Sequence, residues 1–213
     1  MAETKDGHSA PGTKGRVLHA AAGYDLLVWL FLWGRERAFR ERLVTLARLE
    51  PGESVLDVGC GTGSLAIAAK RRVGECGVVH GIDASPAMVA RAGKKARKAG
   101  VDVRFTHGVI ESLPVPDGSV DVVLNTVMLH HLPRAAREQG AREMRRVLRS
   151  GGRVLAADFG RSTPGEKSLV SRLHRHGRVD VEEVVGLFNG VGLRVVETGA
   201  VGVGGMHFVL GAA

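Results

Sequence analysis

The sequence predicts an α/β fold, a single doubly wound and mostly parallel seven-stranded Rossmann-like sheet with an antiparallel last strand and an N-terminal helical lid. Between residues 55 and 157, short runs rich in Val, Ile and Leu alternate with amphipathic helical stretches. A helix between two strands returns the chain to the same edge of the sheet, so these strands are expected to run parallel. The last two apolar runs have no helix between them, which predicts an antiparallel pair. A length of 213 residues fits one domain with a short tail.

Composition excludes several classes of protein. Apolar residues make up 44% and charged residues 24% of the chain, which is the balance of a globular domain and not of a disordered one. Two cysteines are too few for a disulfide framework or a four-thiolate zinc site, and no metal is expected. No apolar run approaches the ~20 residues of a membrane span, and the start of the chain lacks the apolar stretch of a signal peptide. The predicted location is therefore cytoplasmic.

The net charge of +8 raises the question of a polyanionic partner. The basic residues are spread over several expected helices, and two Trp, one Tyr and six Phe are too few for platforms that stack single-stranded bases. DNA is therefore not an expected partner, and the charge is interpreted as a solvated basic surface.

The N-terminal fifty residues are expected to form a flexible tail, 1–15, followed by a helical lid, 16–50. The tail lacks periodicity, whereas the lid carries apolar residues at helical spacing on both sides of Gly34. The apolar run 26–33, with four arginines after it, also suits a helix that lies in a membrane interface. It predicts a peripheral membrane contact through residues 24–42.

Residues 51–158 are expected to hold the parallel part of the sheet, as the core that binds a ligand. Each apolar run is short, as in strands buried on both faces, and the stretches between the runs have one apolar side. The expected strands are 55–58, 78–82, 103–105, 120–124 and 154–157, and the expected helices are 65–73, 85–99 and 134–148.

Residues 159–213 are expected to add a segment beside the site and a closing hairpin. An Asp-x-x-Glu sequence that begins at Asp180 has the spacing of a capping box and predicts a helix start. The strands 193–197 and 206–210 follow, with only a Gly-rich loop between them.

The sharpest motif is Val-Leu-Asp-Val-Gly-Cys-Gly-Thr-Gly at 55–63, a strand that runs directly into a glycine-rich turn and a helix. Glycines let backbone amides approach a ligand closely, and a helix N-terminus carries partial positive charge. The dinucleotide fingerprint would need glycine in place of Ser64, and the Gly-Lys-Ser/Thr of a Walker A loop is absent. The turn therefore predicts a nucleotide-like ligand and disfavours a nicotinamide-dependent oxidoreductase.

The second expected strand ends in Asp83, twenty-four residues after Gly59. An acidic residue at this strand tip can accept hydrogen bonds from both hydroxyls of a ribose. The alternative is that Asp83 caps the next helix. Ser85, which precedes Pro86, is better placed for that task, so ribose binding is favoured.

Together with three further segments, these motifs resemble the class I S-adenosylmethionine-dependent methyltransferases, in particular the small-molecule group that includes ubiquinone/menaquinone and phospholipid methyltransferases. The segments are Glu-Ser-Leu-Pro-Val-Pro-Asp-Gly-Ser-Val-Asp at 111–121, Met-Leu-His-His-Leu at 128–132 and Arg-Val-Leu-Arg-Ser-Gly-Gly at 146–152. The resemblance covers residues 17–157. It implies methyl transfer from S-adenosyl-L-methionine to an oxygen, nitrogen or carbon atom of a small molecule, of which a hydrophobic lipid or quinone-like compound is one candidate.

The resemblance also implies which residues bind the cofactor. In the family the glycine turn runs under the methionine and ribose parts, an acid in the first strand helps to hold the methionine end, and a second acid binds the ribose. The matching positions here are Asp57, Gly59, Cys60, Gly61, Gly63, Asp83, Ala84, Met88, Ile110, Glu111 and Asn125. Where the family usually has an Asp near the adenine amino group, this chain has Val109, so adenine recognition is expected to depend on the backbone around Ile110 and on Glu111.

An acceptor that must lose a proton needs a base above the carboxyl ends of the strands. In phosphobase methyltransferases of the family, a histidine at about the position of His130 works with a tyrosine from an N-terminal helix. The resemblance thus implies His130 and Tyr24, the single tyrosine of the chain, as catalytic residues. The alternatives are that Tyr24 only packs over the cofactor and that His130 or His131 is a structural hydrogen bonder. Asp158 either faces the acceptor or caps the loop after the fifth expected strand.

Two other functions fit the same motifs. A site weakened at Val109 would suit a non-catalytic or degenerate S-adenosylmethionine-binding protein. An RNA methyltransferase that acts on ribose or on a ring carbon is also compatible, although Asn-Thr-Val-Met at 125–128 lacks the Pro-Pro-Tyr/Phe of enzymes that methylate base amino groups. Composition does not separate the candidate acceptors, and the oligomeric state is left open.

Overall fold

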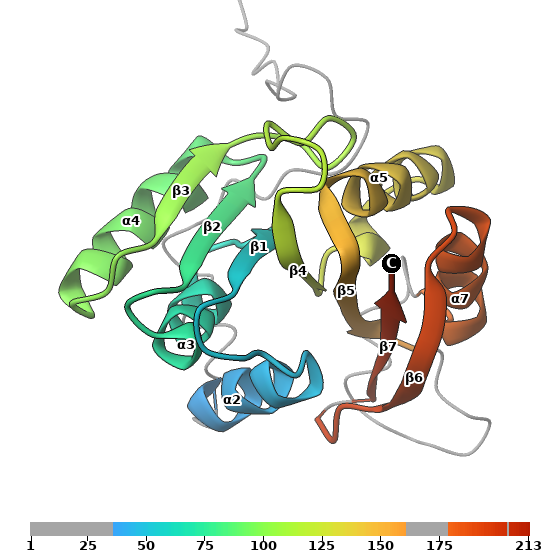
Figure 1. Ribbon diagram of the computed structural model, residues 1–213, viewed down its shortest axis with the longest axis horizontal. Helices are drawn as coiled ribbons and strands as arrows, with labels where there is room; N and C mark the ends of the chain where they lie inside the picture. Colours follow the sequence, from blue (N-terminus) through green and yellow to red (C-terminus); the bar gives the residue numbers. More distant parts are fainter. Residues whose placement is uncertain (1–35, 161–178, 204) are drawn as a thin grey trace, which may run out of the picture.

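A computed structural model describes residues 36–160, 179–203 and 205–213, and these form a seven-stranded sheet covered by helices (Figure 1). The strands are β1 (Ser54–Val58), β2 (Val78–Asp83), β3 (Arg104–His107), β4 (Val120–Thr126), β5 (Leu148–Phe159), β6 (Arg194–Ala200) and β7 (Met206–Ala212). The helices are α2 (Glu36–Leu46), α3 (Ser64–Val73), α4 (Pro86–Lys98), α5 (Arg134–Val147) and α7 (Val181–Gly190), with a short 3-10 turn, η1 (Leu129–His131).

The sheet order is β3-β2-β1-β4-β5-β7-β6, and the predicted fold class is confirmed. The first five strands pair in parallel, whereas β7 lies antiparallel between β5 and β6. Strand order reverses between β1 and β4, so the chain leaves these two neighbours in opposite directions at their carboxyl ends. In open α/β sheets, ligands bind outside the carboxyl ends of the strands at such a reversal, called the crevice below, and the predicted site residues lie at these strand ends.

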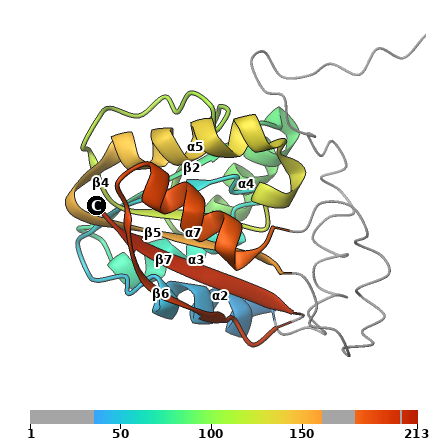
Figure 2. The ribbon, with the colours of Figure 1, turned by 90° about the vertical axis from the view of Figure 1, so that its right-hand side faces the viewer.

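Two apolar clusters hold the helices on opposite faces of the sheet (Figure 2). Alternation along β1 distributes its side chains: Val55 joins the cluster under α2 and α3, whereas Leu56 and Val58 join the cluster under α5 and α7. By the same period of two, Asp57 shares the face of Val55, which α2 and α3 cover.

Helix α2 is the part of the expected lid that the structure describes, and residues 16–35 of that lid lie outside the described part. Phe39 and Leu43 bury the inner side of α2, and Arg153 of β5 fixes its end. The guanidinium of Arg153 donates from Nε to the carbonyl oxygen of Ala47 at 2.7 Å and pairs with Glu53 at 2.7 Å. These bonds set the position of α2 relative to the sheet.

The helix start expected at Asp180 is confirmed, because Asp180 is the N-cap of α7. The capping box suggested by the spacing is wrong, since the Asp180 side chain makes no capping hydrogen bond. The Glu183 carboxylate instead accepts from Nη1 of Arg137 on α5 at 2.5 Å. A charge-assisted bond to a guanidinium is stronger than one to a neutral amide, and it ties α7 to α5.

Within the described residues, no helix is both long enough and apolar enough to cross a bilayer.

Candidate active site

The glycine turn between β1 and α3 adopts a backbone conformation that favours glycine. Gly59, Gly61 and Gly63 have φ of 76°, 53° and 80°. A Cβ at Gly59 would also lie 2.7 Å from the Cγ of Met128, which follows β4. The turn is therefore packed between the ends of β1 and β4, and the amides of Gly59 and Cys60 donate to the carbonyl oxygen of Ile82 at the end of β2.

Asp83, at the end of β2, holds this turn in place. Its Oδ2 accepts a hydrogen bond from the amide of Gly61 at 2.8 Å, and its Oδ1 accepts from the amide of Ser85 at 2.9 Å. Burial raises the pKa of Asp83, and the two amide bonds oppose that rise. Ser85 caps α4 through its Oγ, which accepts from the Met88 amide at 3.4 Å, as the sequence predicted.

Asp57 is a buried acid beside the same turn. It is only 1% exposed, and its Oδ2 has no hydrogen-bond partner among the residues that the structure describes. Burial raises the pKa of Asp57 to about 7; Arg40 lowers it, Asp83 raises it further, and the amide of Ala66 lowers it. A desolvated carboxyl with a vacant acceptor is suited to a cationic ligand group.

The raised pKa of Asp57 makes a prediction about stability. Between about pH 4 and about pH 7 the folded chain holds a proton that the unfolded chain has released, so this group lowers stability as the pH rises through that window. Asp57→Asn cannot ionise at this position. When the pH is raised from 5 to 8, we therefore expect its free energy of unfolding to rise by on the order of 2 kcal/mol relative to that of the wild type. Urea denaturation at both pH values measures this gain. The control is Asp102→Asn at an exposed position. If Asp57→Asn changed the free energy of unfolding equally at both pH values, the raised pKa of Asp57 would be contradicted.

The remaining predicted cofactor residues lie close to this turn or on the far side of the crevice. Cys60 is buried, and its amide donates to the Ile82 carbonyl oxygen at 3.0 Å. Asn125 is 1% exposed and donates from Nδ2 to the carbonyl oxygen of Val58 at 3.0 Å, which joins the ends of β4 and β1. Ala84 follows β2, and its carbonyl oxygen contacts Nε2 of His107 at 3.1 Å.

The segment that departs from the family pattern is well packed. Val109 bridges to Ser112, and the Ile110 side chain is buried against Gly140 of α5, where a Cβ would lie only 2.6 Å away. The Glu111 backbone carbonyl accepts from Gln139 at 3.3 Å. Ile110 thus contributes its side chain to the core and offers only backbone toward a ligand.

His130 and Asp158 form a buried pair at the carboxyl ends of β4 and β5. Nδ1 of His130 lies 2.7 Å from Oδ1 of Asp158, and the two side chains are 6% and 5% exposed. Asp158 also accepts from the backbone amides of His130, at 3.1 Å, and of Phe159, at 2.7 Å. Asp158 therefore shapes the loop after β5, which is one of its two expected roles, and it also contacts the histidine. Its other expected role, facing the acceptor, stays a prediction.

Backbone strain accompanies this pair. Val127, between β4 and η1, has φ of 54°, a left-handed conformation that β-branched residues rarely adopt and that costs ~1–3 kcal/mol. Its amide donates to the Ala157 carbonyl oxygen at 2.8 Å, which holds the strained residue in place. The turn directs η1, and with it His130, toward Asp158.

The other histidines take different positions. His131 lies beside His130, with ring centroids 3.8 Å apart. His207 lies in β7, and within the described residues its Nδ1 is buried without a hydrogen-bond partner, next to the backbone of Gly160. Among the described residues no group of three His, Cys, Asp or Glu is arranged to hold a metal ion. Tyr24 lies outside the described residues.

A comparison with known proteins decides the family. A protein of Thermus thermophilus named demethylmenaquinone methyltransferase is 37% identical over 154 residues, which are 72% of this chain and 69% of that protein. The chain belongs to the S-adenosylmethionine-dependent methyltransferases. The family model described as a methyltransferase domain matches residues 55–152 of this methyltransferase.

Two further proteins define how far the similarity extends. A ubiquinone/menaquinone biosynthesis C-methyltransferase of Azotobacter vinelandii is 35% identical over 146 residues, and the match spans 67% of this methyltransferase but 57% of that relative. A crystal structure of a methyltransferase from Aquifex aeolicus superposes with a TM-score of 0.69 at 24% identity, over 81% of this chain and 88% of that one. The similarity to the Aquifex structure supports the fold.

The cofactor of this methyltransferase is S-adenosyl-L-methionine, and the site residues fit it. The Oδ2 of Asp57, which has no hydrogen-bond partner among the described residues, suits the ammonium group of a methionine moiety. The glycine turn packs so closely against Met128 and Phe105 that a Cβ at Gly59 or Gly63 would collide with them. Asp83 lies one strand away, where a ribose attached to that moiety would follow.

One buried charge was missed from the sequence. Arg40 of α2 lies in the electrostatic environment of Asp57. Within the described residues the Nε of Arg40 is buried without a hydrogen-bond partner, while its Nη2 lies 3.7 Å from Glu36. The signal was present: Arg40 is one turn before Val44, on the stripe of α2 that packs inward, where a largely buried cation is unexpected.

Proposed function

We propose that this methyltransferase transfers a methyl group from S-adenosyl-L-methionine to a ring carbon of a hydroxylated aromatic acceptor of the quinol type. The observation that carries the proposal is the buried His130–Asp158 pair above the crevice. The names of the Thermus and Azotobacter relatives, which refer to demethylmenaquinone and to ubiquinone/menaquinone biosynthesis, support this acceptor class.

The contact with Asp158 suits His130 to act as a proton acceptor. An ionised carboxylate only accepts hydrogen bonds, so the 2.7 Å contact with Asp158 places the proton of a neutral His130 on Nδ1. Nε2 then keeps its lone pair and can take a proton from an acceptor hydroxyl. This is the orientation that a carboxylate imposes on a catalytic imidazole in other folds.

The chemistry of a quinol needs such a base. Bound S-adenosyl-L-methionine supplies a methyl group already activated on a sulfonium. His130 takes the phenolic proton, which leaves electron density on the adjacent ring carbon for attack on that methyl group. The same residue, after it has released its proton, can accept the ring proton whose loss restores aromaticity. Leu129, which is 2% exposed, and the Phe159 ring, 5.8 Å from the His130 ring, help to exclude water.

The cofactor contacts belong to the same proposal. Asp57 receives the ammonium group, the backbone at Gly59, Cys60, Gly61 and Gly63 lies under the methionine and ribose, and Asp83 receives the ribose hydroxyls. Ala84, Met88, Ile110 and Glu111 surround the adenine, and the backbone of Asn125 meets the amino group of the cofactor. Tyr24, from the N-terminal region, assists His130.

A contact with membrane lipid through residues 24–42 suits a lipid-soluble acceptor. In the described part of this segment, Arg37 and Arg42 are exposed on α2. Sedimentation with vesicles of anionic phospholipid should fall in the double variant Arg37→Glu/Arg42→Glu, and unchanged sedimentation would contradict the contact.

The acceptor is tested by a transfer assay. We expect the protein to methylate a naphthoquinol that lacks the ring methyl group, with the new group on carbon as read by mass spectrometry and NMR. The same ring with both hydroxyls blocked as methyl ethers is the matched control, and it should not react because His130 has no proton to take. Transfer to RNA and not to the quinol would favour the RNA methyltransferase. Cofactor binding without transfer to any acceptor would favour the non-catalytic alternative.

A further inference from the structure

We propose that the cleft lined by α2, α3 and α4 binds one anionic phospholipid, whose phosphate contacts Arg71 and Arg72 and whose acyl chain lies along α3. This site is separate from the crevice at the carboxyl ends of the strands, so it goes beyond the proposed function. It gives the protein a specific lipid site in addition to the contact proposed for residues 24–42.

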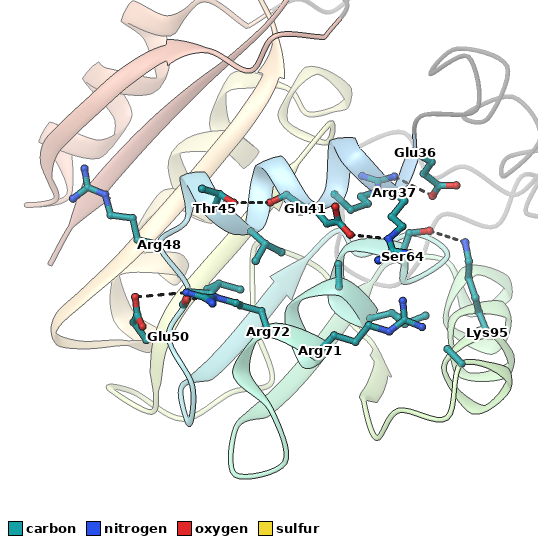
Figure 3. A pocket seen from close by; sticks show the side chains of 16 residues that line it. Glu36, Arg37, Glu41, Thr45, Arg48, Glu50, Ser64, Arg71, Arg72 and Lys95 are labelled. Carbon is teal, nitrogen blue, oxygen red and sulfur yellow. Dashed lines mark hydrogen bonds and ion pairs between the residues drawn. The ribbon is translucent and has the colours of Figure 1, made fainter.

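The cleft follows α3 over nearly its whole length (Figure 3). Ser64, Ala68 and Arg71 lie along one side of this helix, and residues of α2 and α4 line the rest of the cleft. Its volume is about 960 Å³, at the upper end of the roughly 300–1,000 Å³ that is usual for sites of small molecules. Neither Asp83 nor His130 belongs to its described lining, so the cleft is distinct from the candidate active site.

Positive charge predominates in the described lining, of which six residues are Lys or Arg and three are Glu. Two of the arginines already have acidic partners, since Arg37 pairs with Glu41 and Arg48 pairs with Glu197, both at 2.7 Å. Arg71 is different. It is exposed, and within the described part of the chain it makes no hydrogen bond or ion pair. Its guanidinium is therefore available to an anion that enters the cleft.

Arg72, the neighbour of Arg71 on α3, also keeps donors for a ligand. Its Nε donates to the carbonyl oxygen of Leu49 at 2.7 Å, which holds the side chain in place, and its Nη2 lies 3.9 Å from Glu50, too far for a hydrogen bond. Lys95 of α4 adds a third positive charge to the cleft. Guanidinium groups match the geometry of phosphate oxygens and can bind them through two parallel hydrogen bonds.

The apolar part of the lining favours a lipid over a free phosphate or a nucleic acid. Ile67 and Ala68 of α3 lie one turn before the two arginines, and Val44 of α2 lines the same cleft. An acyl chain covers such a surface, whereas inorganic phosphate leaves it in contact with water. The described lining contains no aromatic side chain, so it lacks the stacking surface on which single-stranded nucleic acid depends. An anionic phospholipid supplies both the negative headgroup and the apolar chain.

The test uses a short-chain lipid that stays monomeric, so that binding at a site is separated from attraction to a charged surface. Dihexanoylphosphatidylglycerol is titrated calorimetrically into the full chain below its critical micelle concentration. Dihexanoylphosphatidylcholine and glycerol 3-phosphate are titrated in the same way. We expect saturable binding of the phosphatidylglycerol at one site per chain. The other two compounds should bind at least ~10-fold more weakly, because the first lacks a net negative charge and the second lacks the chains.

Variants of Arg71 test whether the lipid binds in the cleft. Arg71→Glu should weaken the binding of dihexanoylphosphatidylglycerol at least ~10-fold, and Arg71→Lys, which keeps the charge, should retain part of the affinity. The matched control is Arg142→Glu, which changes the net charge equally at an exposed position of α5, on the opposite face of the sheet. It should bind the lipid with the affinity of the wild type. Thermal unfolding shows whether each variant is folded.

Four results would overturn the proposal. Equal weakening in Arg71→Glu and Arg142→Glu would show attraction by net charge and not a site, and unchanged binding in Arg71→Glu would place the lipid elsewhere. Equal affinities for glycerol 3-phosphate and phosphatidylglycerol would make a soluble phosphate the ligand. If the wild type bound a decauridylate and no lipid, the cleft would be assigned to RNA. The quinol transfer assay does not depend on any of these titrations, so failure of this proposal is distinguishable from failure of the proposed function.

Discussion

Replacing His130 with alanine is expected to lower kcat for quinol methylation by about 10²–10⁴-fold, the usual contribution of general base catalysis. The affinity for S-adenosylhomocysteine should not change, because His130 contacts the acceptor and not the cofactor in the proposed arrangement. Steady-state kinetics with the naphthoquinol, together with cofactor titration, measure the two effects separately. Added imidazole should restore part of the rate, since a free base can enter the space that the side chain leaves.

Asp158 acts through His130 as a positioning residue. Asp158→Asn replaces an obligate acceptor with an amide that can also donate, which allows the wrong imidazole tautomer, so kcat should fall while KM for the cofactor is unchanged. His80→Ala is the control, because His80 of β2 contacts Thr106 of the edge strand β3 at 2.8 Å, away from the proposed acceptor site. If kcat of His130→Ala fell by less than 10-fold, or if added imidazole did not restore any of the lost rate, the assignment of His130 as the base would be contradicted.

The second large effect is expected at Asp83. Asp83→Ala removes the acceptors for the amides of Gly61 and Ser85 and, in the proposed site, for two ribose hydroxyls. Hydrogen bonds to a charged group contribute ~1.5–3 kcal/mol each, so the affinity for S-adenosylhomocysteine should fall by at least ~100-fold.

Titration calorimetry measures this loss at Asp83, and thermal unfolding shows whether the variant is folded. Asp83→Asn keeps one acceptor oxygen and should bind with intermediate affinity. The control variant Asp102→Ala, at an exposed position, should bind S-adenosylhomocysteine with the affinity of the wild type. Binding by folded Asp83→Ala within 10-fold of the wild type would contradict the ribose assignment.

The strands could be predicted from the sequence because each is a short β-branched run between glycine-rich turns. The expected run 154–157 is only the middle of β5, which begins at Leu148 and changes register against β4 between Val120 and Val122. The third strand, expected at 103–105, lies at Arg104–His107 on the edge of the sheet, where the alternation is weak. A register change and an edge depend on neighbouring strands, so local periodicity does not encode them.

The candidate site was predictable in a similar way. The glycine turn and Asp83 are sequence neighbours of strand ends, so a local motif located them. The contact between His130 and Asp158 joins residues 28 positions apart, and the burial of Arg40 depends on which face of β1 its helix covers. The Asp180 capping box failed for the same reason, because Arg137 competes for the Glu183 carboxylate from another helix.

The measurement that tests the cofactor site most directly is a calorimetric titration of the wild-type protein with S-adenosylhomocysteine, with NADH as the control. The glycine spacing, Asp57 and Asp83 together predict saturable binding of S-adenosylhomocysteine with one site per chain and no binding of NADH. Binding of NADH, or failure of a folded protein to bind S-adenosylhomocysteine, would contradict the account of the site.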